Sequence, residues 1–567
     1  MDQCERYINN WISLYEANDR LAKKNLCLSM DFRKEANDSF LYNEDKKSEK
    51  AYKRILSLYS KSIAFAPKNL DELLAMTYAN RSALLLHLKK YTECLRDIDT
   101  ALELTKSEFL RFKLLARKDQ CSALVKSCGE NDAPPVNDRR AATISASADR
   151  TYVSDCLSVM YSEKYGRYVQ ASRDIRPGEI VVVERGYVTF AKRDKAYLIC
   201  SHCLESAWAA VPCPDCSIVV YCSESCRREA YDRYHSEECP ILPYVRCFDC
   251  DEIELETCML ALRSFIIAVK EEGWTRVVQQ VQSIDEQRDK YEEGEFPSEP
   301  FLSRSFRSMY SLSYLDNVDD DYGDTHDRML ADLIERKTNL LHINEDEVDV
   351  FENKEERANF VRNLLKKLRK IININSFQFQ DSSCKCEDFQ ECTSSCDTVR
   401  GAIVLPYSSL LNHSCYPNVE RTFARPGKIV LFSTRPIGRG EQLYDSYGPV
   451  VGIGRQERQD YLRDYFGFTC ECRACRENWS THTSSCSVIQ MRDSAVTKSF
   501  FTELLIKRLH DVFVLPLIKR PIDVATLEKT ILLIEIIYKY FDGFVAYADS
   551  LSHRTYIERA FCKFYGV

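Results

Sequence analysis

Apolar residues recur with helical spacing through the first part of the chain, up to about residue 126. In YANRSALLLHLKKYTECLRDIDTALEL (Tyr78–Leu104), small or apolar residues return every three or four positions, and the pattern breaks once, near Lys89-Lys90. Such a break predicts two helices joined as a hairpin. Upstream, YSKSIAFAP (Tyr59–Pro67) repeats the end of such a unit, and the polar insert NEDKKSEK stretches the unit that contains it.

The pattern changes after residue 126. Residues 127–150 are mostly small and polar with two prolines, which indicates a linker. Beyond them, EKYGRYVQASRDIRPGEIVVVERGYVTF (Glu163–Phe190) alternates apolar and polar residues as strands do, with a turn at Arg176–Glu179. Strand character returns near GAIVLPYSSLL and GKIVLFSTRPI. A β-rich region therefore follows the N-terminal helices.

Helical patterns fill residues 251–372, interrupted by acidic segments such as DNVDDDYGD (Asp316–Asp324), which we expect to be solvated loops. The tail from about residue 494 also indicates helices, including TLEKTILLIEIIYKYF, whose apolar positions predict core packing. A chain of 567 residues is too long for a single core. The elements together predict a multidomain α+β protein.

Composition narrows the class of protein. The net charge of -8 argues against binding by phosphate neutralisation, so nucleic acid is not expected as the main partner. There is no run of 18 apolar residues, and the start MDQCERYINNW lacks the features of a signal peptide, so no membrane partner is expected. These features predict a cytoplasmic and nuclear location. In such a reducing place, 26 cysteines indicate metal binding rather than disulfides.

A short block between residues 200 and 239 holds eight potential metal ligands in four close pairs. The pairs are Cys200 with Cys203, Cys213 with Cys216, Cys222 with Cys226, and His235 with Cys239. Eight such ligands are enough for two closed tetrahedral zinc sites. About 40 residues provide no large apolar core, so zinc binding would supply most of the folding free energy of this block.

A third set of cysteines lies in FTCECRAC, at Cys470, Cys472 and Cys475. Three thiolates leave a tetrahedral site one ligand short, and Cys415 lies fifty-five residues upstream of Cys470. Two other groups are less informative. The cysteines at positions 384, 386, 392 and 396 form either a fourth small site or free thiols of a polar insert, and Cys247 with Cys250 has no visible second pair.

Three motifs carry a resemblance to a known family. NHSCYPN (Asn412–Asn418), GEQLYDSYG (Gly440–Gly448) and the CxCxxC set resemble the SET domain of protein lysine methyltransferases. The eight-ligand block resembles a MYND zinc finger, and a SET domain split by such a finger resembles the SET-and-MYND-domain (SMYD) family. YANRSA (Tyr78–Ala83) and CLRDIDTAL (Cys94–Leu102) resemble tetratricopeptide repeats, which a branch of that family carries at its N-terminus.

The resemblance implies a β-rich SET domain split by the finger and a helical insert, with helices at both ends. It implies an N-terminal tetratricopeptide-like region at residues 1–126, a linker at 127–150, the first part of the SET domain at 151–199, the MYND finger at 200–239, a helical insert at 240–372, the SET core at 373–468, a post-SET zinc segment at 469–480 and a C-terminal helical region at 481–567.

The same resemblance implies the grouping of the metal ligands. One zinc ion is expected on Cys200, Cys203, Cys222 and Cys226, a second on Cys213, Cys216, His235 and Cys239, and a third on Cys415, Cys470, Cys472 and Cys475. About three structural zinc ions are therefore expected, with no catalytic role.

The implied activity is methyl transfer from S-adenosylmethionine to a lysine of a histone or non-histone protein. A site for this displacement has to align the two reactants and desolvate the amine. By motif, Tyr447 is the expected catalytic residue. The expected cofactor-binding residues are Gly166, Arg167, Tyr168, Asn375, Asn412, His413, Tyr447 and Phe468. Tyr168 stands where the family often has the second glycine of a GxG loop, and it either stacks beside the adenine or narrows the pocket.

The repeat region suggests a second binding function. Arg33, Asn37, Asn80, Lys113 and Arg117 resemble the clamp with which chaperone-binding repeats hold a peptide's terminal carboxylate. The expected partners are thus a substrate protein, a chaperone C-terminal peptide at the repeats and a proline-rich peptide at the finger. The alternative to an enzyme is a zinc-containing adaptor with a weak or inactive SET domain, acting in transcriptional repression or chaperone recruitment. The substrate, the degree of methylation and the oligomeric state stay open.

Overall fold

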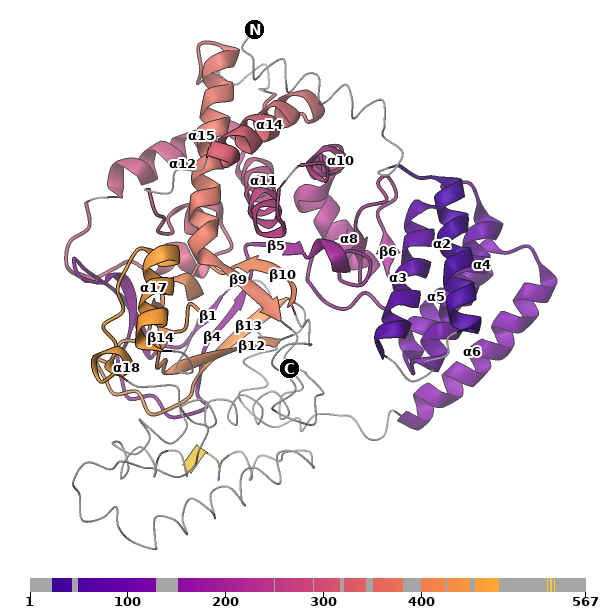
Figure 1. Ribbon diagram of the computed structural model, residues 1–567, viewed down its shortest axis with the longest axis horizontal. Coiled ribbons are helices and arrows are strands. Elements are labelled where there is room, and N and C mark those ends of the chain that lie inside the picture. The colour runs from indigo at the N-terminus through magenta and orange to yellow at the C-terminus, as the bar shows by residue number, and fades with distance from the viewer. Residues whose placement is uncertain are drawn as a thin grey trace, which may run out of the picture.

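The computed structural model describes residues 23–42, 49–128, 151–248, 250–288, 290–316, 321–342, 350–380, 399–424, 427–448 and 454–478, with residues 528, 531, 532 and 535 near the C-terminus. The described chain forms an N-terminal group of helices, a β-rich part and a second group of helices that covers the β-rich part (Figure 1). The cysteines at positions 384–396 and most of the predicted C-terminal region lie outside the described residues.

The N-terminal group consists of helices packed side by side (Figure 1). They are α2 (Leu26–Leu41), α3 (Glu49–Phe65), α4 (Asp71–His87), α5 (Tyr91–Leu104) and α6 (Glu108–Cys128). The predicted hairpin between Tyr78 and Leu104 is confirmed, because α4 ends and α5 begins on either side of Lys89, which adopts a positive φ of 58°. The amphipathic faces of these helices bury a shared core that includes Leu84, Leu85 and Ile98.

The N-terminal helices dock against the block that holds the eight metal ligands. Arg81 and Asp97 form a buried bidentate pair, with Nε to Oδ2 at 2.7 Å and Nη2 to Oδ1 at 2.8 Å. Arg81 also donates to the carbonyl of Ala210 at 3.1 Å, and Lys24 donates to the carbonyl of Cys213 at 2.8 Å. Ala209 joins the apolar core of the helices. Backbone carbonyls of the ligand block therefore serve as acceptors for the helical region.

The β-rich part is built from several small sheets. Its strands are β1 (Tyr152–Val153), β2 (Leu157–Ser162), β3 (Gly166–Ala171), β4 (Ile180–Arg185), β5 (Val188–Ala191), β8 (Gly294–Glu295), β9 (Ser376–Gln380), β10 (Val399–Val404), β11 (Asn412–His413), β12 (Val419–Ala424), β13 (Lys428–Ser433) and β14 (Tyr444–Asp445). The sheet orders are β1-β4-β13-β12, β5-β10-β9, β3-β2-β8 and β11-β14. The predicted strands between Glu163 and Phe190 are thus confirmed.

Strand β4 lies at the centre of the largest sheet. Five of its six residues, Ile180 to Glu184, are buried, so the run IVVVE is continuous rather than alternating, as expected for a strand covered on both faces. Its partner β13 is buried along its whole length and pairs with β4 antiparallel. The core of the β-rich part is therefore fixed by these two neighbouring strands.

The ligand block and the helical insert complete the described fold. Their elements are β6 (Val211–Pro212), β7 (Val220–Tyr221), α8 (Glu224–Ala230), the π-helix η2 (Tyr231–His235), α9 (Ser236–Glu238), α10 (Leu242–Val245), α11 (Glu252–Glu272), α12 (Trp274–Gln287), the 3₁₀-helix η3 (Glu299–Leu302), α13 (Phe306–Tyr310), α14 (Asp321–Lys337) and α15 (Lys354–Asn375). Short 3₁₀-helices η1 (Arg193–Lys195) and η4 (Ser408–Leu410), and the helices α17 (Arg455–Phe466) and α18 (Arg473–Arg476), complete the set.

The predicted helical insert is confirmed, and one loop expectation within it is wrong. The end of the acidic stretch, from Asp321, is the start of α14 rather than a loop. Asp324 there pairs with Lys366 of α15 at 2.7 Å between Oδ1 and Nζ, which ties the start of α14 to the neighbouring helix. Helix α11 is buried from Thr257 to Val269, yet none of the described helices has a stretch apolar enough to cross a bilayer.

Candidate active site

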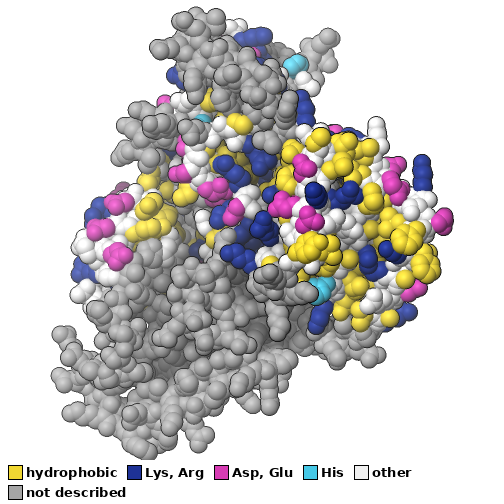
Figure 2. All heavy atoms as spheres, turned by 45° about the vertical axis from the view of Figure 1, so that its right-hand side comes forward, with side chains coloured by type: hydrophobic (Ala, Val, Ile, Leu, Met, Phe, Trp, Pro, Cys, Tyr) yellow, Lys and Arg dark blue, Asp and Glu magenta, His cyan; other side chains and the backbone are white. Residues whose placement is uncertain are grey.

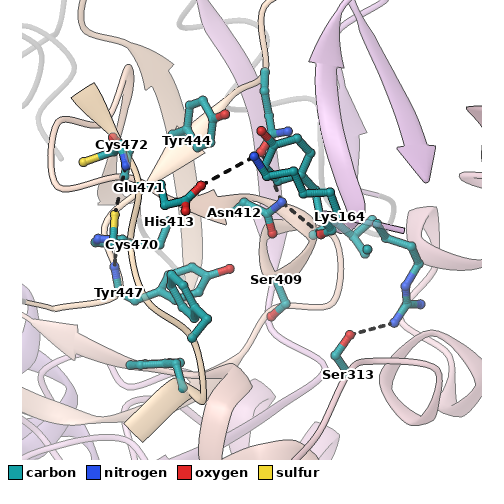
Figure 3. Close-up of a pocket in the computed structure, with 18 of the residues that line it drawn as sticks. Lys164, Ser313, Ser409, Asn412, His413, Tyr444, Tyr447, Cys470, Glu471 and Cys472 are labelled. Carbon is teal, nitrogen blue, oxygen red and sulfur yellow. Dashed lines mark hydrogen bonds and ion pairs between the residues drawn. The ribbon is translucent and has the colours of Figure 1, made fainter. Parts of the chain in front are cut away.

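A cavity of about 770 Å³ lies where distant parts of the chain meet. Its walls come from the turn before β3, the end of α15, strand β11, the stretch around β14 and the chain that follows α17. Figure 3 shows Asn412, His413 and Tyr447 on one side of this space, with Lys164 and Glu471 facing each other across it. Lys164 and Glu471 form an exposed ion pair, with Nζ to Oε2 at 3.5 Å.

The two sequence motifs meet through a short parallel pair of strands. Strand β11 pairs with β14, so that Asn412 lies opposite Tyr444 and His413 opposite Asp445. The amide of Ser414 continues this pairing by donating to the carbonyl of Asp445 at 2.9 Å. Residues about thirty positions apart thereby line one wall of the cavity.

A buried carboxylate holds the turn that leads into β11. Glu184 of β4 accepts hydrogen bonds from the amides of Tyr407 and Ser408, at 2.8 and 2.9 Å, and from the Ser408 hydroxyl at 2.6 Å. Burial raises the pKa of the Glu184 carboxyl to about 7. Because η4 begins at Ser408, this carboxylate caps the short helix and fixes where Ser409 enters the cavity wall.

Tyr447 is held by its backbone and its hydroxyl group. Its hydroxyl donates to the carbonyl of Leu411 at 2.7 Å, and its amide donates to Nδ1 of His413 at 3.0 Å. Its ring packs against Phe466 and Phe468, with centroids 5.0 and 6.3 Å away. Burial, followed by the charge of the nearby Asp445, raises the pKa of Tyr447 well above the ordinary tyrosine value. The side chain therefore stays a neutral phenol at physiological pH.

His413 connects Tyr447 to the third cysteine cluster. Because Nδ1 accepts the Tyr447 amide, the ring proton of a neutral His413 lies on Nε2. Nε2 lies 3.3 Å from Sγ of Cys415, so it can donate to that sulfur. The imidazole is 6% exposed and is thus a bridge inside the wall rather than a free group in the cavity.

The two predicted asparagines line the cavity with their amide groups partly engaged. Asn375 uses Nδ2 to donate to the carbonyls of Ser313 and Ile371, at 2.8 and 2.7 Å. Asn412 uses Nδ2 to donate to the carbonyl of Tyr165 and to Oε1 of Gln442, at 3.2 and 3.1 Å. Both side-chain nitrogens are therefore satisfied by the protein, which orients each amide and leaves its carbonyl oxygen as the group for a ligand.

Gly166 at the start of β3 is followed by Arg167 and Tyr168, and these two side chains differ in their relation to the cavity. Gly166, with a φ of 62°, and Arg167 line the cavity, whereas Tyr168 is not among the lining residues. Successive side chains of a strand point to opposite faces, and the Tyr168 ring instead meets Tyr165 edge-on at 6.0 Å. The structure therefore brings two of the three predicted residues of this turn to the cavity and leaves Tyr168 outside its wall.

Arg167 is a buried guanidinium in this wall. It stacks against Phe296 and Phe301, at 5.8 and 5.4 Å from the ring centroids, and donates through Nη2 to Ser313 Oγ at 3.2 Å. Its Nη1 is buried without a hydrogen-bond partner among the described residues. Burial lowers the pKa of Arg167 to about 10, so the side chain still carries its charge near neutral pH.

The third cysteine cluster forms part of the same wall. The thiol sulfurs of Cys415, Cys470, Cys472 and Cys475 all lie within 4.8 Å of one another and could hold a metal ion. Helix α17 ends at Phe466 and is capped by Gly467, whose φ of 72° turns the chain toward Phe468 and this cluster. Arg458 lies behind the cluster, with Nη2 at 3.8 Å from Sγ of Cys475. Cys470 and Cys472 line the cavity, so the cluster and the cavity share residues.

Two more clusters lie in the ligand block, away from the cavity. One consists of Cys200, Cys203, Cys222 and Cys226, and the other of Cys213, Cys216, His235 and Cys239. This is the interleaved grouping that the sequence resemblance implies. His235 directs Nε2 to Cys213 at 3.2 Å and Nδ1 to Glu238 at 3.1 Å, which orients the ring for a metal ligand. Within the described part of the chain, Cys247 and Cys250 belong to no such group.

Comparison with known proteins agrees with this site. The family model "SET domain" matches residues 166–448. The protein-lysine N-methyltransferase SMYD4 of Mus musculus is 25% identical over 82% of this chain and 70% of its own length. A SET and MYND domain-containing protein of Dictyostelium discoideum is 24% identical over 56% of this chain and 81% of its own length. The chain belongs to the SET-and-MYND-domain (SMYD) family.

Similarity within the SMYD family is uneven along the chain. The protein-lysine N-methyltransferase SMYD4 of Danio rerio is 31% identical over 237 residues, which cover 39% of this chain and 30% of that relative. The SET match runs from Gly166, the first residue of β3, to Gly448, three residues after β14. In SMYD terms, the block of eight ligands lies between two parts of one SET domain.

Several SMYD site residues have no signal in the sequence. Glu184 and Arg458 are common residue types outside the motifs, and Gln442 is a common residue type inside GEQLYDSYG. The roles of all three depend on partners between 17 and 224 positions away. Of the site residues that the sequence did not predict, Phe466 had the clearest signal, because it lies two positions before the predicted Phe468. Any scan for aromatic residues just ahead of the CxCxxC set would have included it.

The five predicted clamp residues lie on α2, α4 and α6 of the N-terminal group. On α2, Arg33 contacts Met76 and Asn37 accepts from Asn80 Nδ2 at 2.9 Å. On α6, Arg117 donates to the Ala79 carbonyl at 2.6 Å, and Lys113 lies over the Phe109 ring. Helix α4 thus connects the two basic side chains of α2 and α6 through contacts on one surface.

Proposed function

We propose that this chain is an S-adenosylmethionine-dependent protein-lysine N-methyltransferase. One observation carries the proposal. Tyr447, Asn412, His413, Asn375 and Phe468, which the sequence scatters over more than ninety positions, line a single cavity beside a cysteine cluster. Membership in the SMYD family and the methyltransferase names of the relatives support the same reaction.

The donor set of the cavity fits S-adenosylmethionine. The buried Arg167 has an unpartnered Nη1, which suits the carboxylate of the methionine part. Asn375 and Asn412 present carbonyl oxygens that suit an ammonium or hydroxyl group, because their nitrogens are already engaged. When bound, S-adenosylmethionine supplies the methyl group on a positively charged sulfonium. The residues that would hold it are thus Arg167, Asn375 and Asn412, with Gly166 allowing close approach of the backbone.

The aromatic residues would prepare the lysine. Tyr447, Phe466 and Phe468 form an apolar wall in which the charged ammonium is less favourable, and desolvation shifts a lysine toward its neutral, nucleophilic amine. The same ring faces tolerate the cationic product through cation–π contact. Because the Tyr447 hydroxyl already donates to Leu411, its oxygen is left as an acceptor that orients the amine. Its raised pKa means that it does this as a phenol and does not act as a base.

Alignment would be the main contribution of the protein to the rate. Positioning two reactants for an in-line displacement removes much of the entropic barrier, worth up to about 7–11 kcal/mol in well-oriented systems. Here two buried side chains do the positioning. Glu184 caps the turn before β11, and His413 accepts a hydrogen bond from the Tyr447 backbone amide.

We assign zinc to the three clusters as a structural metal. Each cluster offers four thiolate or imidazole donors in a closed set, and no donor position is left for a substrate. The Cys415 cluster would fix the chain after α17 against the cavity, whereas the other two would fix the MYND finger. In this assignment zinc contributes folding free energy and no step of the methyl transfer.

Cofactor binding is the sharpest test of this function. Titration of zinc-loaded full-length protein with S-adenosylmethionine in a calorimeter should give saturable heat, and the variant Arg167→Gln should bind at least about tenfold more weakly. Arg173→Gln, a substitution of an exposed arginine outside the cavity, is the matched control. Absence of heat from the wild-type protein would contradict the enzyme and favour the adaptor. Transfer of labelled methyl groups to a protein array would then identify the substrate, histone or not.

A second function is favoured by the N-terminal helices. Arg33 and Arg117 have no carboxylate partner among the described residues, and burial lowers the pKa of both. Exposed hydrophobic side chains such as Phe109, Phe112 and Met30 lie on the same group of helices, and Figure 2 shows apolar side chains gathered over this part of the surface. We infer a site for a peptide that ends in a free carboxylate, as at the C-terminus of a chaperone.

The carboxylate itself makes this second function testable. A labelled acidic peptide with a free C-terminus should bind in fluorescence anisotropy, and its C-terminally amidated form should bind at least about tenfold more weakly. Arg117→Ala should reduce binding similarly, while Lys126→Ala, at the far end of the same helix, should not. Equal binding of the two peptide forms would exclude a carboxylate clamp. The proline-rich partner at the finger stays a prediction.

A further inference from the structure

Four arginines line a small cleft behind strand β4, remote from the methyl-transfer cavity. They come from the end of β4, from η2, from α11 and from the segment between η3 and α13: Arg185, Arg233, Arg263 and Arg304. The enclosed part of this cleft measures about 10 Å³, which is room for one water molecule. Any larger ligand would therefore bind at the mouth of the cleft, where side chains from three parts of the chain converge.

Three of the four guanidinium groups form a hydrogen bond with a carboxylate. Arg263 donates through Nε to Glu238 at 2.8 Å and is fully buried. Arg233 donates through Nε to Glu271 at 2.7 Å. Arg185 makes a longer contact, Nη2 to Glu229 at 3.3 Å, and Glu229 also lies 3.3 Å from Nε2 of His202.

The fourth guanidinium is different. Arg304 donates through Nε to the carbonyl of Gly186 at 3.0 Å and has no carboxylate within ion-pair distance among the described residues. Among the guanidinium and carboxylate groups of the cleft, four positive side chains thus face three negative ones, and Arg304 has no carboxylate of its own. Burial, followed by the charges of Arg233 and Arg185, lowers the pKa of Arg304 to about 9. An anion at the mouth would offset this repulsion.

The backbone between the arginines is fixed in a way that suits a binding site. Arg304 donates to the carbonyl of Gly186, and Arg233 donates through Nη1 to the carbonyl of Tyr187 at 2.9 Å. Two neighbouring peptide groups therefore anchor two of the four guanidinium groups. Addition of a Cβ at Gly186 would bring it within 2.3 Å of Ile403, which keeps this turn pressed against the sheet. The arginines are therefore arranged before any ligand arrives.

We propose that Arg185, Arg233 and Arg304 form a binding site for a phosphate-class oxyanion, supplied either as free phosphate or as a phosphorylated serine or threonine of a protein. Guanidinium groups pair with phosphate through two parallel hydrogen bonds, and a tetrahedral anion can accept from three directions at once. A planar carboxylate matches such a convergent set less well. Nucleic acid does not fit, because a single uncompensated charge flanked by Glu229 and Glu271 is no continuous basic track.

Inorganic phosphate is the first probe. Thermal unfolding of the zinc-loaded full-length protein should shift upward with phosphate in a saturable way, compared with chloride and acetate at equal ionic strength. Arg304→Gln should weaken the apparent affinity for phosphate at least tenfold. Arg304→Lys, which keeps the charge but lacks the two parallel hydrogen-bond donors of a guanidinium, should weaken it less. Arg307→Gln is the matched control, since Arg307 is exposed on the neighbouring helix α13.

The outcomes separate the proposal from its competitors. Equal stabilisation by phosphate and chloride, or equal effects of the Arg304 and Arg307 variants, would overturn it. Arg185→Gln provides a second test if Arg304→Gln fails to fold, because it removes a charge without touching Gly186. Zinc content and S-adenosylmethionine binding should be unchanged in all variants, which distinguishes failure here from failure of the methyltransferase assignment.

A peptide pair then identifies the source of the phosphate. A labelled peptide with phosphoserine, its unphosphorylated form and free phosphate as competitor should be compared on the same protein. Preference for the phosphopeptide over free phosphate by tenfold or more, lost in Arg304→Gln, assigns a phosphorylated protein. Comparable affinity for both assigns free phosphate. Arg304-dependent binding of a single-stranded oligonucleotide in preference to both would overturn the choice of ligand.

Discussion

The MYND clusters and the Cys415 cluster use the same kind of donors in different settings. The eight MYND donors lie within forty consecutive residues, and their block contacts the N-terminal helices through the carbonyls of Ala210 and Cys213. The Cys415 cluster instead joins residues 55 to 60 positions apart and shares Cys470 and Cys472 with the cavity wall. The local MYND clusters, whose ligands are close in sequence, thus lie where two parts of the molecule contact each other. The remote Cys415 cluster, whose ligands are distant in sequence, lies in the wall of the cavity.

The strongest test of this contrast removes Cys415. Cys415→Ser should lower bound zinc from about three to about two ions per chain, because four ligands make one site. Loss of the wall should also reduce methyl transfer by more than about 100-fold, since displacement of a reacting group by 1 Å has such an effect. Metal analysis and a methyl-transfer assay measure both. Cys27→Ser, at an exposed cysteine of α2, is the control, and an unchanged zinc count would separate Cys415 from the cluster.

Substitution of Tyr447 tests the cavity without removing a ligand of the Cys415 cluster. Tyr447→Phe should reduce methyl transfer by about 100-fold or more, the range for loss of one positioned polar group, while S-adenosylmethionine affinity changes by less than about twofold. Tyr465→Phe, at an exposed tyrosine of α17, should leave both quantities unchanged. A large loss of cofactor affinity in the Tyr447 variant would show that the phenol binds the cofactor rather than orients the amine.

A change in the MYND finger should affect the N-terminal helices more than it affects cofactor binding. Cys216→Ser should also remove about one zinc ion, but its main effect should be on the N-terminal helices, whose acceptors include the neighbouring Cys213 carbonyl. Hydrogen exchange should increase most in α3 and α4, and S-adenosylmethionine affinity should fall by no more than about threefold. If cofactor binding is lost as completely as in Cys415→Ser, the distinction between local and remote clusters is wrong.

The smallest expected effect concerns the buried carboxylate on the cavity side. The pKa of Glu184 is raised to about 7 from an ordinary value near 4.3, because burial disfavours its charge. A raised carboxyl pKa stabilises the fold fully below the ordinary value, and this contribution is lost as the pH rises toward and past 7. Compared with Glu184→Gln, the wild-type unfolding temperature should therefore decline between pH 5.5 and pH 8.

The control for this pH prediction is Glu163→Gln, at an exposed carboxyl group of the turn before β3. Its difference from the wild type should stay constant across the same pH range. A constant difference for Glu184→Gln as well would mean that its three hydrogen bonds from Tyr407 and Ser408 outweigh burial.

The parts of the site that the sequence predicted are those that depend on local spacing. Paired cysteines, the NHSC motif and the DSYG motif each bring chemistry together within a few residues, so their composition alone is informative. The helical hairpin around Lys89 was predictable for the same reason, because its period is visible over one segment. The family resemblance then connected segments that spacing could not.

Contacts between distant segments were beyond sequence reasoning. Nothing in the sequence places the carboxylate of Glu184 at Ser408, 224 positions later, or stacks Arg167 on Phe301. The same limit explains Tyr168, which the motif aligned with the cofactor loop but which is not among the residues that line the cavity. The expectation of a loop at Asp321 failed because helix propensity there depends on packing against α15.

The docking of the N-terminal helices has a consequence for the order in which the chain matures during synthesis. Arg81 finds its acceptor on Ala210, 129 residues later, and Arg96 finds the carbonyl of Cys222, 126 residues later. A ribosome adding about 5–20 residues per second delivers those partners several seconds or more after the helices emerge. If the finger folds on binding zinc, as we propose, the acceptors are fixed only after the metal is bound. The N-terminal helices would then be finished late, at a moment set by zinc supply.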